Sequence, residues 1–170
     1  MNRFIRLRLA GPAVGALLGA AAPAAAGGDG PKVVFLGFEL IDTSLAPESP
    51  AERARLAMLD DLLRDRIGHS RHFRLVPVPP AVQRKLTAGA AISGCNGCER
   101  DLAKAAGANW AAWGTVQKVS ELILNINVYI EDAGSGKMEF VKSVDIRGNT
   151  DQSWSRGLDY LLRNYLLQEP

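Results

Sequence analysis

Cys95 and Cys98 are the residues whose type and spacing most clearly allow chemistry in this chain. They are its two cysteines, and with an Asn-Gly step between them they form a CxxC pattern, which occurs in disulfides, redox centres and metal sites. Glu99 follows where a c-type haem attachment motif requires histidine, so haem attachment is excluded. The turn-forming Asn-Gly step and the helical character of residues 99–107 predict a tight loop that leads into a helix.

A disulfide between Cys95 and Cys98 is the expected state of the pair, because neighbouring thiols oxidise in the compartment that the N-terminus predicts. The loop is short, so the chain-entropy contribution of the bridge to stability is about 2 kcal/mol. The alternatives are a soft metal ion such as Cu(I) on the two thiolates, or a redox-active pair. His69 and His72 could complete a four-ligand zinc site, although both lie in a short turn segment.

Residues 1–26 have the pattern of a secretory signal peptide. Arginines at positions 3, 6 and 8 precede an apolar stretch at 10–22, and three alanines at 24–26 fit a cleavage site. The stretch is too short and too rich in Gly and Ala for a membrane span. We therefore predict an exported periplasmic protein with no membrane span in its mature form. No cysteine follows the cleavage site, so a lipid anchor is not expected.

Charge and residue content narrow the classes of function. Without the leader's three arginines, 17 basic and 18 acidic residues remain, and no basic run or aromatic stripe indicates a nucleic-acid partner. The sequence has no Ser/His/Asp set, phosphate-binding glycine loop or nucleotide fingerprint. Its two histidines both fall in one turn, so the sequence offers few candidates for general acid–base catalysis. We therefore expect a protein that is not an enzyme.

The first half of the chain after the leader predicts two strands and three helices. Residues 32–41 form an almost continuous apolar run, typical of a strand covered on both faces. Ser49, Pro50 and Glu52 form a capping box at the start of a helix whose leucines recur at helical spacing up to Gly68. The elements that follow are a short strand at 73–78, a weak helix at 81–89 and a helix at 99–107.

The second half predicts an antiparallel meander and a last helix. The middle strand has one apolar face, made by Leu122, Leu124, Ile126, Val128 and Ile130. A Gly-containing hairpin loop at 132–136 leads to the returning strand. The last helix begins near Thr150, and its apolar stripe runs from Trp154 to Tyr165.

Together these elements predict one domain over residues 27–170 with an α/β (α+β) fold. The expected order is β-α-β-α-α-β-β-β-α. A mixed sheet would end in the antiparallel meander, and the helices would pack mainly on one face.

Two groups of polar residues are candidates for binding a partner. Asn125, Asn127 and Tyr129 project from the polar face of the middle strand, where asparagine is disfavoured. A second group crowds the junction between the last strand and the last helix, at Asp145, Arg147, Asn149 and Asp151. The alternative for the first group is an ordinary solvated sheet face. For the second it is a surface ion pair with a helix cap.

Four segments resemble a family of small exported bacterial proteins that is known only as a domain of unknown function. They are FELIDTS (38–44), CNGCE (95–99), 114–137 and 143–166. The element order and the step at 107–116 more distantly resemble the TolB N-terminal domain and the envelope lipoproteins CsgG and LpoB. This resemblance implies an assembly or activator module. We therefore expect a non-enzymatic periplasmic binding or accessory module with a protein partner in the cell envelope and no cofactor. The alternative is a thiol-based metal or redox protein that uses Cys95 and Cys98.

Overall fold

The computed structural model describes residues 30–88 and 91–168, so the predicted leader lies outside the described part of the chain. The fold class and the element order are confirmed. The elements are β1 (Lys32–Asp42), α1 (Pro50–Gly68), β2 (Arg74–Val76), α2 (Pro80–Ala88), the 3₁₀ turn η1 (Ile92–Gly94), α3 (Cys98–Ala105), β3 (Trp110–Ser120), β4 (Ile123–Asp132), β5 (Met138–Ile146), α4 (Asp151–Leu161) and the π turn η2 (Leu162–Leu166). None of the helices in these ranges has both the length and the apolar character needed to cross a bilayer.

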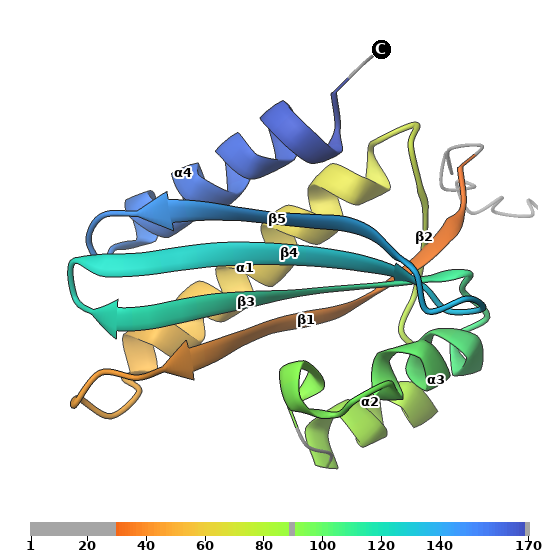
Figure 1. The fold of residues 1–170 in the computed structure, drawn as a ribbon, viewed down its shortest axis with the longest axis horizontal. Coiled ribbons are helices and arrows are strands. Elements are labelled where there is room, and N and C mark those ends of the chain that lie inside the picture. Colours follow the sequence, from red (N-terminus) through yellow and green to blue (C-terminus); the bar gives the residue numbers. More distant parts are fainter. Residues whose placement is uncertain (1–29, 89–90, 169–170) are drawn as a thin grey trace, which may run out of the picture.

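The strands form one mixed sheet in the order β2-β1-β3-β4-β5 (Figure 1). β1 is parallel to both β2 and β3, whereas β3, β4 and β5 form the predicted antiparallel meander. The chain crosses from β1 to β3 through α1, β2, α2 and α3, which places helices on both faces of the sheet. β5 is the outer strand at one edge, and the three-residue β2 is the outer strand at the other.

Two hydrophobic cores lie on opposite faces of the sheet. The larger core lies under α1 and α4, whose Leu59, Leu63, Trp154 and Leu158 are fully buried. The smaller core lies under α2 and α3, which cover only one end of the other face (Figure 1). The two long helices therefore share one face, and the rest of the opposite face has no helix over it.

Helix starts follow the predicted capping chemistry. The Ser49 hydroxyl accepts a hydrogen bond from the Glu52 amide at 3.2 Å, and the Glu52 carboxylate accepts one from the Ser49 amide at 2.6 Å. This capping box fixes the first turn of α1. Thr150 caps α4 by accepting from the Ser153 amide at 3.1 Å.

A β-bulge in β1 changes which side chains reach the larger core. The register with β3 shifts between Phe35 and Phe38, so both rings lie in that core, with centroids 5.7 Å apart. The Phe38 amide donates to Asp60 Oδ1 of α1 at 2.8 Å, which satisfies a group that the bulge takes out of the ladder.

Two apolar residues expected on core-facing stripes lie at the surface. Leu122 falls in the turn between β3 and β4 and is 70% exposed, because β4 begins one residue later. Tyr165 is 44% exposed, because η2 changes the helical period after Leu161. The tyrosine ring instead lies 5.1 Å from the Lys142 ammonium.

Candidate functional site

The structure joins Cys95 and Cys98 in a disulfide at the start of α3. The turn between them has positive φ at both positions, 48° at Asn96 and 111° at Gly97. These are the residue types that adopt such angles most readily, which explains the local sequence. α3 begins at Cys98, so the bridge ties the first residue of the helix to the preceding loop.

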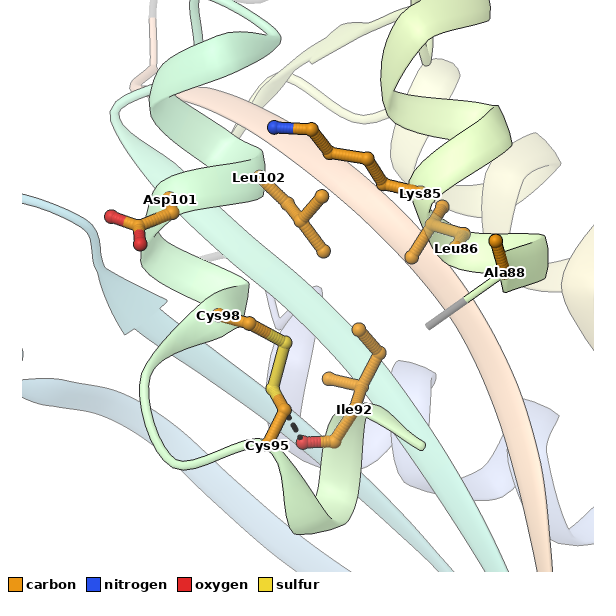
Figure 2. Close-up of a pocket in the computed structure, with 8 residues that line it drawn as sticks. All are labelled: Lys85, Leu86, Ala88, Ile92, Cys95, Cys98, Asp101 and Leu102. Atoms are coloured by element: carbon orange, nitrogen blue, oxygen red, sulfur yellow. Dashed lines mark hydrogen bonds between the residues drawn. A yellow bond between two sulfur atoms is a disulfide. The ribbon is translucent and has the colours of Figure 1, made fainter. Parts of the chain in front are cut away.

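A cavity of about 440 Å³ lies between α2 and α3, and the disulfide forms part of its wall (Figure 2). Leu86 of α2 and Leu102 of α3 point into it from opposite sides. The Lys85 chain extends across its upper side in this view, whereas Asp101 points away. The cavity is mainly apolar, so the disulfide acts here as a packing surface as well as a cross-link.

A pair of buried carboxyl groups lies beside the disulfide. Glu99 is 8% exposed and Glu131 is 6% exposed. Glu99 Oε2 accepts a hydrogen bond from the Gly97 amide at 3.1 Å and lies 3.3 Å from Cys95 Sγ. Burial raises the pKa of Glu131, and the neighbouring Glu99 raises it further. Arg100 lies 3.7 Å from Glu131 and opposes the shift without cancelling it.

The metal alternative depends on what lies around the two sulfurs. The Sγ atoms of Cys95 and Cys98 and a carboxylate oxygen of Glu99 all lie within 4.8 Å of one another. After reduction, Cys95, Cys98 and Glu99 could therefore offer a metal ion three ligands. His69 and His72 line a different hollow beside Asp65 and Arg66. Metal binding at Cys95 and Cys98 stays a prediction, to be tested by metal analysis of the reduced protein.

Replacing Glu131 with glutamine is expected to raise the free energy of unfolding at pH 7 by about 1 kcal/mol, the size of one buried hydrogen bond. A raised pKa means that the folded protein holds the Glu131 proton more tightly than the unfolded chain does. Stability of the native protein therefore falls as pH rises from the ordinary carboxyl pKa of 4.5 through the raised value. Urea unfolding at pH 4 and pH 7 measures the effect.

The increase in the free energy of unfolding from Glu131→Gln should become smaller toward pH 4, where Glu131 is already protonated in the folded protein. Glu48→Gln makes the same change at a solvent-exposed carboxylate and should have little effect at either pH. An equal gain at both pH values would show that charge on Glu131 is not the cause.

The sheet has an open face, defined by Gln117, Asn125, Asn127, Val141, Ser143 and Asp145. The register pairs Asn125 with Gln117 on one side and Asp145 on the other, and it pairs Asn127 with Thr115 and Ser143. Asn127 Nδ2 donates to Thr115 Oγ1 at 3.1 Å and to Asn125 Oδ1 at 2.9 Å. Gln117, Ser143 and Asp145 are exposed. Asn127 is 9% exposed and Asn125 is half-buried, so the asparagines form an ordered row beneath the exposed side chains of Gln117, Ser143 and Asp145.

Tyr129 lies on the same face of the sheet, at the end that α2 and α3 cover. Its ring stacks on Trp113 with centroids 5.2 Å apart, and it packs against the smaller core. The structure therefore brings Asn125, Asn127 and Asp145 together and places Tyr129 at the border of their surface.

The other junction residues lie elsewhere. Asn149 Nδ2 donates to Glu52 Oε1 at 2.7 Å. Arg55 of α1 donates to Asn149 Oδ1 at 3.0 Å and to Asp151 Oδ1 at 2.8 Å. These contacts fasten the β5–α4 junction to α1. Arg147 is exposed and lines a groove between β5 and α4.

Sequence reasoning missed a buried charge cluster around Lys118. Lys118 is 1% exposed, and its ammonium nitrogen lies 2.6 Å from Glu52 Oε1, 2.8 Å from Glu121 Oε1 and 3.4 Å from Asp42 Oδ2. Hydrogen bonds to Glu121 and Glu52 raise the pKa of Lys118 against the effect of burial. The side-chain alternation of β3 could have revealed this cluster, because it places Lys118 on the core-facing side with Ala112 and Val116.

Comparisons with known proteins give a family and a shared fold. The model of the DUF3280 family, described as "Protein of unknown function (DUF2380)", matches residues 31–166. No curated protein is similar enough to the sequence to be matched. The LpoB C-terminal domain from Salmonella enterica superposes with a TM-score of 0.50 at 13% identity, covering 69% of this chain and 83% of that one.

Two further structures are similar at lower scores. The PelC dodecamer from Paraburkholderia phytofirmans has a TM-score of 0.48 at 12% identity, with 79% of this chain and 86% of that chain covered. TolB from Acinetobacter baumannii has a TM-score of 0.43 at 12% identity, with 81% of this chain and 29% of that chain covered.

Proposed function

We propose that this chain, which belongs to the DUF3280 family of proteins of unknown function, is a non-enzymatic periplasmic module that binds a protein of the cell envelope. The observation that carries the proposal is the open face of the sheet. α1 and α4 pack against one face, whereas α2 and α3 lie over one end of the other face and leave its polar part free.

The open face has the chemistry of a protein-binding surface. The buried Asn127 donates to Thr115 and to the half-buried Asn125, so the Asn125 amide nitrogen is already oriented for a partner. Val141 is 52% exposed and adds an apolar contact next to this row. Interfaces commonly combine such apolar contacts with hydrogen bonds at a polar rim. The resemblance to envelope assembly and activator modules supports the same class of role.

Site-specific photo-crosslinking in cells tests the proposal. A photoreactive residue at Gln117, in the open face, is expected to give a discrete cross-link to one envelope protein. The same residue at Asp61, which is exposed on α1, is the matched control and should give none. Asn125→Ala should weaken the purified partner's binding about fivefold, as expected for the loss of roughly 1 kcal/mol of hydrogen bonding.

Two outcomes would contradict the proposal. One is equal cross-linking from Gln117 and Asp61, which would indicate contact without a defined surface. The other is the absence of any cross-link from Gln117 together with turnover of a substrate by the purified protein.

A further inference from the structure

β5 presents a free strand edge. It is the outer strand of the sheet, and its register partners within the described residues all belong to β4. The amide and carbonyl groups on its outer side are therefore open to pairing with another extended chain. Such an edge is the usual template for peptide recognition by strand addition.

A groove of about 680 Å³ runs between this edge and α4. Arg147 lies at its β5 end, and Arg156 and Tyr160 of α4 and Arg163 of η2 line its other side. Among the described residues, Asp145 is the one acidic residue that lines it. Arg163 is paired with Asp159 at 2.8 Å, whereas Arg147 and Arg156 have no ion-pair partner within 30–88 and 91–168.

We propose that this groove binds an extended acidic segment of a protein, which adds to β5 as a sixth strand. The inference rests on the proposed function in taking the ligand to be a protein, and it goes further by giving the ligand's charge and conformation. The strand edge supplies main-chain hydrogen bonds, and the arginines supply the preference for carboxylates.

A second copy of this chain does not fit the groove as well. A second β5 edge carries Lys142 together with Glu139 and Asp145, so it offers no excess of carboxylates to the arginines of the groove. An acidic segment offers that excess and can pair with the strand edge as well. Anionic lipid could also meet the arginines, but it would leave the backbone groups of β5 without partners.

The test uses the protein purified from the periplasm and a display library of random twelve-residue linear peptides. Enriched peptides are expected to alternate acidic with β-branched residues. Arg147→Glu/Arg156→Glu should weaken the best of them at least tenfold. Arg53→Glu/Arg84→Glu makes the same charge change at exposed sites on α1 and α2 and should alter binding less than twofold. Bound peptide should slow amide hydrogen exchange in β5.

Several results would overturn the inference. They are a library that yields no binder, enriched peptides without acidic residues, or affinity that is unchanged by Arg147→Glu/Arg156→Glu. Binding to vesicles of anionic phospholipid with the same arginine dependence, but without slowed exchange in β5, would also overturn it. If the peptides fail while the Gln117 cross-link persists, the groove inference falls and the proposed function stands.

Discussion

Lys118→Met is expected to lower the free energy of unfolding by about 3–5 kcal/mol, the range found when one partner of a buried ion pair is removed. Glu52 is 1% exposed and would keep its negative charge with its main partner gone. Methionine fills a similar volume, so the loss comes mainly from this uncompensated charge and not from a cavity. Urea unfolding at pH 7 measures the change.

Two variants separate charge from packing at this position. Lys137→Met removes a lysine that is 70% exposed and paired with Glu139, and it should change stability by less than about 0.5 kcal/mol. Lys118→Met/Glu52→Gln should recover about half of the loss, because glutamine is neutral and can still accept from the Ser49 amide. A Lys118→Met protein as stable as the native one would rule out this account.

The same cluster predicts how stability depends on acid. Burial acts to raise the pKa of Glu52, but the hydrogen bonds that Glu52 accepts, above all from Lys118, outweigh it and lower the pKa to about 2. A lowered carboxyl pKa contributes stability above the ordinary value of 4.5, and that stability is lost as pH falls toward 2. In Lys118→Met this loss between pH 5 and pH 3 should be smaller.

The cluster also connects the proposed binding surfaces to the core. Lys118 ends the core-facing side of β3, and Gln117, beside it in the chain, belongs to the open face. Asn149 joins the cluster through Glu52 and Glu121, and it lies two residues from Arg147 of the groove. Because Lys118→Met lowers global stability, we expect it to weaken partner binding by the fraction of protein that it unfolds.

The parts of the fold that follow from local chemistry were predictable. The capping box of Ser49 and Glu52 is a contact between residues three apart, and it was predicted from their types alone. The alternation in β4 placed Asn125 and Asn127 on the face opposite Leu124 and Ile126, as the structure confirms. Period and spacing carry this information within a single element.

Contacts between distant residues were not predictable in the same way. The bulge in β1 turns Phe38 toward the larger core, and its amide is satisfied by Asp60, 22 residues later. Partner binding by Asn149 and Asp151 stays a prediction, but the hydrogen bonds that both accept from Arg55, more than 90 residues away, were not foreseen. Such pairings depend on how helices pack against the sheet, which the pattern within one segment does not contain.

Gly114→Ala is expected to lower the free energy of unfolding by about 3 kcal/mol, at the upper end of the range for overpacking. A Cβ at this position would lie 2.0 Å from Phe38 Cε1. Phe38 is 8% exposed and packs edge-on against Phe35, so its ring cannot move away without disturbing the core. Gly114 is thus required by the bulge that directs Phe38 inward.

A double-mutant cycle with Phe38→Leu decides whether the ring is the cause. Gly114→Ala should cost less than about 1 kcal/mol when leucine replaces Phe38, which gives a coupling energy of about 2 kcal/mol between the two sites. Gly134→Ala, in the β4–β5 loop, is the matched control, since the nearest atom to its Cβ is an Asp132 oxygen at 3.2 Å. If Gly114→Ala costs the same in both backgrounds, the requirement for glycine comes from the β3 backbone and not from Phe38. The open face, which shares β3 with Gly114, should then lose partner binding in both backgrounds alike.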